Sequence, residues 1–418
     1  MNTRSPLRTL RLLSCTALAL AFLQIVFGAI VRITGSGMGC GDSWPTCRGY
    51  LFPPLERPDL VIEVTHRYLA AALGVAIIVL VGAAFFATRR VRAASGVYGA
   101  GTMDSRLRGN DEGRGGNDKL RSGNDKQRGG SDRGGETRGA GEAVGAVFRA
   151  TLLAAGIYAA VALFGALTVT LGTHPIVNVV HLALAMSLLA TLALAVMRGG
   201  GLGATRAAFG GGSAKTYRGA LAAAIMTFVI LVLGALTANL PGAAEACVGF
   251  PLCRNGYDGP VHLQLTHRIF AFLLFFHLLG LMIATTQRRE PAAVVSMARI
   301  AFGLVLAQLL VAAALVELRL PPQLQSLHQA IGTLVWLGVI VFAAIAHRAS
   351  RTTFGGATRT GPGTRATPGV AEPMVDSWLS TDAPITDERN DPGNPDASAP
   401  GSSVRPLDGE GAAGGRGT

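Results

Sequence analysis

Eight apolar runs, each long enough to cross a lipid bilayer, constrain the fold of this chain more than any other feature. The runs cover residues 12–33, 63–88, 147–171, 175–197, 217–239, 262–286, 294–316 and 323–347. A helix needs about 20 mainly apolar residues to span the hydrocarbon core. Half of the chain is hydrophobic and only 15% is charged, a balance that argues against a soluble enzyme. The sequence therefore predicts an all-α integral membrane protein with eight transmembrane helices.

The formal net charge of +12 does not indicate a nucleic-acid partner, because the basic residues gather at span ends on one side of the eight-helix topology. These residues are Arg4, Arg8, Arg11, Arg89, Arg90, Arg92, Lys215, Arg218, Arg288, Arg289, Arg348 and Arg351. Positively charged flanks remain on the cytoplasmic side of a membrane. We therefore expect a multi-pass protein of the bacterial inner (cytoplasmic) membrane, with the lipid bilayer as its solvent and both termini cytoplasmic.

Two segments lack the apolar pattern. Residues 101–143 repeat Gly-Asn-Asp or Gly-Ser-Asp every seven residues, without the apolar positions that a coiled coil needs. Residues 352–418 are rich in Gly, Pro, Ser, Thr and Asp. Both segments are predicted to be disordered and cytoplasmic, and the sequence assigns no function to either.

An internal repeat appears once the 101–143 insert is set aside. Each half has a span, a loop with two cysteines, a span that begins with Thr-His-Arg, a third span, and a fourth span with a single histidine near its outer end. The repeat predicts two pseudo-symmetric four-helix bundles, over residues 12–197 and 217–348.

Four histidines occupy equivalent places in this repeat. His66, His181, His267 and His328 each fall about four to six residues inside the outer end of a span, or roughly 6–9 Å below it. Two imidazoles from facing helices commonly hold the iron of a haem. Hydrogen bonding to a neighbouring helix is the alternative for each histidine, and a compact copper or zinc site prefers three or four clustered ligands.

Charged and polar residues accompany the histidines of the Thr-His-Arg spans. Glu63 precedes His66 by three residues and shares its helix face, so this carboxylate can hold or move a proton there. Gln264 takes the same place in the second half and cannot titrate. Arg67 and Arg268 suit the propionates of a porphyrin, or they reach the membrane interface as snorkelling side chains.

Two cysteine pairs lie in the outer loops. Cys40 and Cys47 are close in sequence, as are Cys247 and Cys253, so each pair can close a local loop in a compartment where disulfides persist. A structural disulfide is one interpretation of each pair, and a redox relay with a thiol partner is the other. Cys15 lies within the first span and is predicted to be a buried thiol.

Several of these stretches closely resemble haem A synthase, the membrane enzyme that makes the haem of cytochrome oxidase. They are "GAIVRITGSGMGCGDSWPTCRG", "IEVTHR", "LQLTHR", "NVVHLALA" and "QSLHQAIG". The resemblance covers about residues 12–348 and omits the insert and the tail.

The resemblance implies an oxidoreductase that converts the C8 methyl group of haem O to a formyl group by successive oxidations, with an oxygen atom derived from water or dioxygen, and so produces haem A. It implies that His66 and His181 flank the substrate haem, that Glu63 is catalytic, and that His267 and His328 ligate a haem b (iron) cofactor. The implied partners are haem O synthase and a membrane or quinol-linked electron donor, with a homo-oligomer as a further possibility.

Two other functions fit the histidine pairs. A di-haem quinol-linked cytochrome would move electrons without chemistry at a porphyrin carbon, and a haem carrier or assembly protein would only bind porphyrin. The difference between the ionisable Glu63 and the neutral Gln264 favours an enzyme over a carrier, since a carrier gains nothing from one ionisable group.

Overall fold

The computed structural model describes the chain except for residues 1–3, 42–45, 108–118, 203–210, 255–258 and 357–418. The helices are α1 (Arg4–Ile33), η1 (Ser36–Met38), α2 (Pro58–Leu107), α3 (Lys119–Thr170), α4 (Pro175–Arg198), α5 (Ala214–Asn239), α6 (Val261–Gln287), α7 (Ala292–Glu317) and α8 (Pro322–Gly356). Helices α1 to α8 belong to one compact unit, Met1–Gly361.

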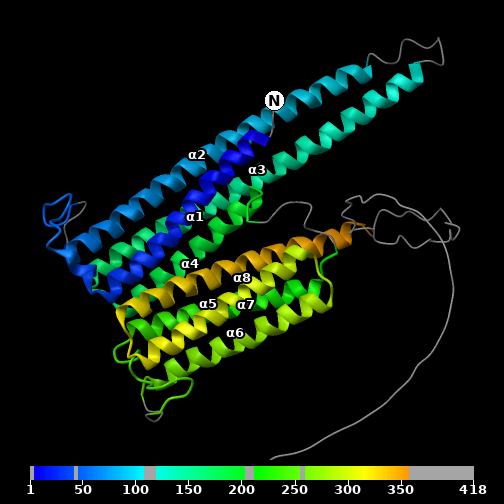
Figure 1. Ribbon diagram of the computed structural model, residues 1–418. Helices are drawn as coiled ribbons and strands as arrows, with labels where there is room; N and C mark the ends of the chain where they lie inside the picture. The colour runs from blue at the N-terminus through cyan, green and yellow to red at the C-terminus, as the bar shows by residue number, and fades with distance from the viewer. Residues whose placement is uncertain (1–3, 42–45, 108–118, 203–210, 255–258, 357–418) are drawn as a thin grey trace, which may run out of the picture. The chain divides into compact units, whose positions relative to one another are not determined.

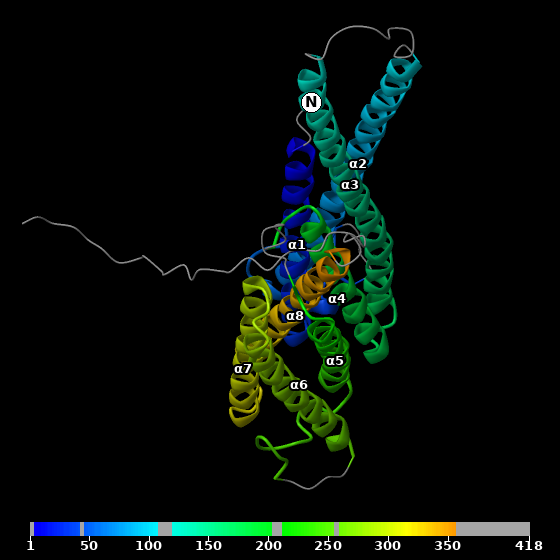
Figure 2. The same cartoon turned by 90° about the vertical axis from the view of Figure 1, so that its right-hand side faces the viewer.

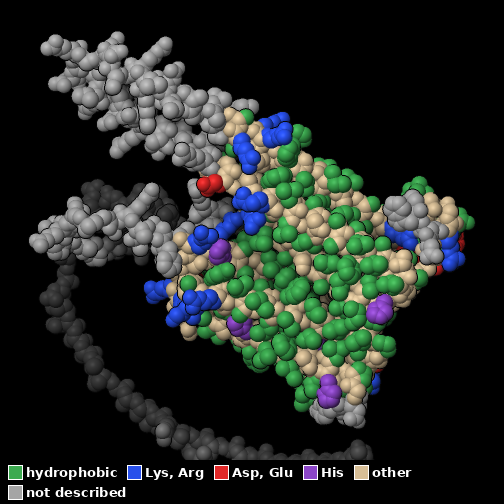
Figure 3. Space-filling model, turned by 180° about the vertical axis from the view of Figure 1, so that it is seen from behind, with side chains coloured by type: hydrophobic (Ala, Val, Ile, Leu, Met, Phe, Trp, Pro, Cys, Tyr) green, Lys and Arg blue, Asp and Glu red, His purple; other side chains and the backbone are tan. Residues whose placement is uncertain are grey.

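Eight helices in the described part of the chain are long and apolar enough to cross a membrane, and each contains one predicted span. Hydrophobic side chains cover much of the helical surface in Figure 3, and Ile78, Phe276 and Leu310 are among the large exposed ones. Such a surface would favour aggregation in water but matches the hydrocarbon of a bilayer. The prediction of an all-α, multi-pass membrane protein is confirmed.

The two halves of the chain pack their helices in the same order. In the first half α1 contacts α2, α2 contacts α3, α3 contacts α4, and α4 returns to α1. In the second half α5 to α8 contact one another in the same cyclic order (Figures 1 and 2). The sequence repeat is thus also a repeat of helix packing.

Helices α4 and α8 lie between the two halves. Half or more of their most apolar windows is buried, at 50% and 56%, against 33% or less in the other spans. The indole N–H of Trp336 on α8 donates to the carbonyl of Met186 on α4 at 2.8 Å, and the Trp336 ring packs on Phe228 of α5. A helix that is apolar all round is suited to such a central place.

The structure differs from the sequence-based expectation in the insert. Residues 101–107 continue α2 and residues 119–143 belong to α3, whereas the whole of 101–143 was expected to be disordered. A helix that is already nucleated in a span lengthens with one hydrogen bond per added residue, and residues 89–143 contain no proline to stop it. Most of the predicted tail, residues 357–418, lies outside the described residues.

Cys15 is exposed on α1, so the prediction of a buried thiol is wrong. Its neighbour Ser14 is fully buried, and the Ser14 hydroxyl donates to the carbonyl of Leu10 at 2.8 Å. Neighbouring residues on a helix point about 100° apart, so Ser14 and Cys15 cannot both face the bundle.

Candidate functional site

The four histidines lie on the even-numbered helices at matched depth. His181, His267 and His328 each come six residues after the first residue of their helix, and His66 comes eight residues after the first residue of α2. His66 interacts electrostatically with His181, and His328 with His267. The histidines therefore form two pairs, one in each half of the molecule.

One histidine of each pair is anchored by a backbone carbonyl. The Nδ1 atom of His181 lies 3.0 Å from the carbonyl oxygen of Val161 on α3, and the Nδ1 atom of His267 lies 3.1 Å from that of Ile230 on α5. A carbonyl oxygen only accepts, so Nδ1 must carry the proton in both rings. The Nε2 atom of each ring then keeps its lone pair, which is the arrangement typical of a metal-binding histidine.

The other histidine of each pair is held by a glutamine amide. Gln24 on α1 donates its Nε2 to the carbonyl of His66 at 3.1 Å and lies 3.2 Å from the Nε2 of the same residue. Gln308 on α7 donates to the carbonyl of His328 at 3.0 Å and lies 3.1 Å and 3.3 Å from the two ring nitrogens. Each glutamine thus contacts both the backbone and the imidazole of one histidine.

Glycines make room for three of the rings. A Cβ atom added at Gly28, Gly165 or Gly234 would come within 3.1, 3.2 or 2.9 Å of the Cε1 atom of His66, His181 or His267, respectively. Contacts this short force one of the two residues to move. The odd-numbered helices α1, α3 and α5 therefore approach the imidazoles of their neighbours as closely as only glycine permits.

The chemistry of each pair fits the axial ligands of a haem iron. Each pair supplies two imidazoles from neighbouring parts of one bundle, all four residues are half-buried, and one ring in each pair presents an Nε2 lone pair. Among the residues that the structure describes, His, Cys, Asp and Glu do not gather in groups of three or more that could hold a metal ion. The described part of the chain thus offers two histidine pairs and no larger cluster of these residue types.

The glycine beside His267 gives a direct test of this fit. We expect Gly234→Ala to lower the haem affinity of the second pair by about tenfold, since overpacking a tight contact typically costs about 1–3 kcal/mol. The measurement is the haem-to-protein ratio and absorption spectrum of the purified protein. Gly280→Ala on α6 is the matched control, because a Cβ there meets nothing within 4 Å. An unchanged haem ratio in Gly234→Ala would contradict a tight fit around His267.

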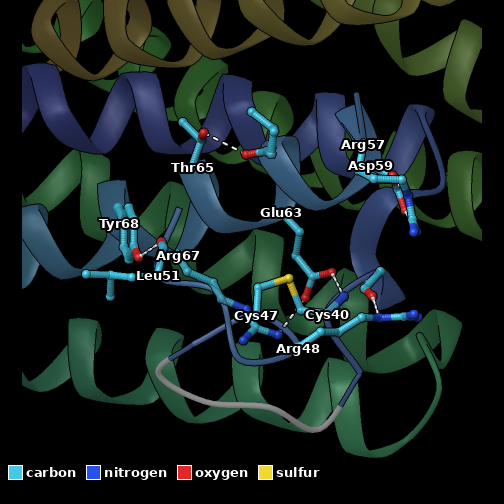
Figure 4. The surroundings of a disulfide bond; sticks show 12 residues. Cys40, Cys47, Arg48, Leu51, Arg57, Asp59, Glu63, Thr65, Arg67 and Tyr68 are labelled. Carbon is cyan, nitrogen blue, oxygen red and sulfur yellow. Dashed lines mark hydrogen bonds and ion pairs between the residues drawn. A yellow bond between two sulfur atoms is a disulfide. The ribbon is translucent and has the colours of Figure 1, made fainter. Parts of the chain in front are cut away.

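The Glu63 side chain points from α2 toward the Cys40–Cys47 disulfide, as Figure 4 shows. One carboxylate oxygen accepts the backbone N–H of Cys40 at 2.8 Å, and the other pairs with the guanidinium of Arg67 at 2.6 Å. Glu63 is only 4% exposed, so this charge is held away from solvent by specific partners. The carboxylate therefore fixes the loop to α2 one turn before His66.

Gln264 makes the equivalent contact in the second half. Its side-chain oxygen accepts the backbone N–H of Cys247 at 2.7 Å, and its amide donates to the carbonyl of Ala244 at 3.2 Å. The loop contact thus survives the change from carboxylate to amide. What the second half lacks at this position is the negative charge.

The two arginines have different partners. Arg67 pairs with Glu63, whereas Arg268 donates to the carbonyls of Cys247, Gly249 and Pro251 in the second loop. Arg268 is 7% exposed and belongs to the scaffold of that loop. Propionate binding by either arginine stays a prediction.

Both cysteine pairs form the predicted local disulfides. Cys40 is bonded to Cys47, and Cys247 is bonded to Cys253. Three of these cysteines are nearly inaccessible, and Cys253 is 9% exposed. Burial together with the backbone contacts of Glu63 and Gln264 favours the structural interpretation over a relay that must meet a thiol partner.

The comparison with known families agrees with this geometry. A sequence model of the family described as cytochrome oxidase assembly protein (COX15-CtaA) matches residues 11–103 and 140–340. The match contains the four histidines, Glu63 and both disulfides. The chain belongs to this family. The unmatched residues between the two segments, 104–139, fall within the insert.

Individual relatives cover different shares of the chain. A heme A synthase of Geobacillus kaustophilus is 45% identical over 67 residues, 16% of this chain and 21% of that protein. A heme A synthase of Shouchella clausii is 28% identical over 303 residues, 68% of this chain and 79% of that protein. A protoheme IX farnesyltransferase of Thermus thermophilus is 53% identical over 45 residues, 11% of this chain and 7% of that protein. The chain thus spans about a fifth of the first relative's length and about four fifths of the second's.

Sequence reasoning missed the two glutamines and the glycines beside the rings. A signal was present, because Gln24 and Gln308 are polar residues inside apolar spans, each followed one turn later by a small residue, Gly28 or Ala312. Polar side chains within a span are costly and mark functional positions.

Proposed function

We propose that this protein is a haem A synthase, an oxidoreductase that converts the C8 methyl group of haem O to a formyl group. The observation that carries the proposal is the pair of histidines in each half, with one ring of each pair anchored through Nδ1. Membership of the cytochrome oxidase assembly family and the names of the Geobacillus and Shouchella relatives support the assignment. The Thermus relative's name describes farnesyl transfer to protohaem, the modification that distinguishes haem O from protohaem.

The proposed roles differ between the two halves. His66 and His181 flank the substrate haem, while His267 and His328 ligate a resident haem b. A bound haem b supplies one-electron transfer. Among the described residues, only the first half has a buried carboxylate one turn from one of its paired histidines, and this asymmetry supports placing the oxidation there.

Glu63 is the proposed proton-handling group. It lies on the same face of α2 as His66, and one of its oxygens is 2.6 Å from the guanidinium of Arg67. A proton that leaves the substrate could pass to this oxygen, with Arg67 compensating the charge before and after. In the second half the amide of Gln264 has no such capacity.

The proposed location follows from the basic flanks of the spans. With Lys and Arg on the cytoplasmic side, both termini and the insert are cytoplasmic and both disulfide loops lie on the outer side of the bacterial inner membrane. The histidine layer is then close to the outer surface. Haem O synthase and a membrane or quinol-linked electron donor are the proposed partners.

The haem extracted from the purified full-length protein tests the function. A haem A synthase is expected to yield haem B together with haem O, a hydroxylated intermediate or haem A. Haem B alone, in a protein supplied with haem O, would favour a quinol-linked cytochrome. A preparation without haem would contradict both enzymatic functions.

The insert is expected to be dispensable for this reaction. Deleting residues 104–140 removes the end of α2, the connection and the beginning of α3, and it leaves the predicted spans 63–88 and 147–171 intact. His66 lies near the opposite end of α2. We expect the haem content and haem A yield of the deletion variant to match those of the full chain. Loss of haem A in a variant that still inserts and binds haem would reveal a role for the insert.

A further inference from the structure

The same position on each odd-numbered helix contacts a histidine of the next helix. On α3 and α5 this position holds Val161 and Ile230, whose backbone carbonyls face the Nδ1 atoms of His181 and His267. On α1 and α7 it holds Gln24 and Gln308, whose side-chain amides face the rings of His66 and His328. Each pair thus contains one carbonyl-anchored histidine and one amide-held histidine.

The glutamine amides occupy a ring lone pair that a bound iron would also need. An NH2 group has two hydrogens, and Gln24 directs one of them to the backbone carbonyl of His66 and the other towards its ring nitrogen. A ring nitrogen that faces an N–H must accept, so its lone pair is engaged. This lone pair is the one that a metal ion requires.

A carbonyl and an amide N–H engage a ring in different ways. The carbonyls of Val161 and Ile230 accept the N–H at Nδ1 and leave the Nε2 lone pair of their ring free. The amide of Gln24 donates one N–H to the backbone carbonyl of His66 and the other to the ring of the same residue, so it occupies a ring lone pair.

We propose that Gln24 and Gln308 are positioning residues that make His66 and His328 the exchangeable ligands, while His181 and His267 are the fixed ones. The inference rests on the proposed haem sites and goes beyond them, because it ranks the two ligands of each pair. An imidazole that leaves its coordination position finds a hydrogen-bond donor on the adjacent helix. A coordination position can thus open by movement of one side chain, without movement of a helix.

Carbon monoxide binding to the dithionite-reduced, full-length protein tests this ranking. Gln24→Leu removes the amide N–H that competes for the ring lone pair, so His66 should dissociate from the haem iron less readily. We expect the carbon monoxide affinity of the first site to fall by about two- to tenfold, the factor typical of one hydrogen bond, with unchanged haem content. Gly82→Ala on α2 is the control in the same half, where an added Cβ meets nothing within 4 Å and no change is expected.

Gln308→Leu gives an independent test at the second pair, should the Gln24 variant lose haem. The same fall in carbon monoxide affinity is expected there. Haem-loaded wild-type protein that binds no carbon monoxide, or glutamine variants with unchanged or higher affinity, would overturn the ranking. Wild-type protein that binds no haem would instead overturn the proposed function.

Discussion

Glu63→Gln is expected to fold, to bind haem in both halves, and to accumulate haem O or a partly oxidised intermediate. A general acid or base typically contributes about 10²- to 10⁴-fold to a rate, so the haem A yield should fall by a factor in that range. The measurement is the composition of haem extracted from the variant after supply of haem O.

The structure explains why this substitution removes the negative charge of residue 63 but keeps its hydrogen bond to the disulfide loop. Gln264 accepts the N–H of Cys247 at 2.7 Å, almost the same contact that Glu63 makes with Cys40 at 2.8 Å. A glutamine at position 63 can therefore keep the disulfide loop in place. It loses the ion pair with Arg67 and the ability to take up a proton.

Two further variants distinguish proton uptake by Glu63 from the effect of its ion pair with Arg67. Gln264→Glu places a carboxylate under the second loop and should leave haem A formation largely unchanged, because the proposed chemistry belongs to the first half. Arg67→Gln keeps the Glu63 carboxylate without its cation and should retain more activity than Glu63→Gln. Near-normal haem A yield from Glu63→Gln would leave Glu63 as a clamp for the loop and end its catalytic assignment.

Two further substitutions with a large expected effect are His267→Ala and His328→Ala, each of which should abolish the low-spin b-type spectrum. Each change removes one of two axial imidazoles, and a single remaining imidazole does not give a six-coordinate, bis-histidine iron. Absorption spectra of the reduced and oxidised proteins, with haem extraction, measure the loss. Haem at the first pair should remain detectable, since its ligands belong to the other half.

His277→Ala provides the matched control for these variants. His277 lies on α6 like His267, but its Nε2 donates to the carbonyl of Gly219 on α5 at 2.8 Å. Its replacement removes one interhelical hydrogen bond, with a modest effect of about 0.5–1.5 kcal/mol on stability. A normal b-type spectrum in His267→Ala and His328→Ala would refute the ligand assignment.

The predicted features confirmed by the structure are those that depend on local sequence. Hydropathy places eight spans because each helix must satisfy its own backbone hydrogen bonds in lipid, whatever its neighbours are. The disulfides follow from the short sequence spacing: only seven positions separate Cys40 from Cys47, so the two side chains stay close in space. The histidine depth follows from counting residues along rigid helices.

The features that sequence reasoning missed depend on which helices meet. No local pattern says that Glu63 reaches the N–H of Cys40, or that Gln24 on α1 reaches His66 on α2. The exposure of Cys15 likewise depends on the rotation of α1 against its bundle. Such contacts join residues from separate elements, and their partners exist only after packing.

The membrane topology, the twofold repeat and the four histidines are properties of the amino-acid order, because hydrophobic length and residue spacing act within one helix at a time. The carbonyl and amide contacts of the four histidines, the hydrogen bonds of Glu63 and Gln264 to the disulfide loops and the central place of α4 and α8 belong to the tertiary structure. They arise because close packing fixes the height along the neighbouring helix at which a glycine, a carbonyl or an amide makes its contact. A sequence lists these groups, and only the packed helices decide which of them touch.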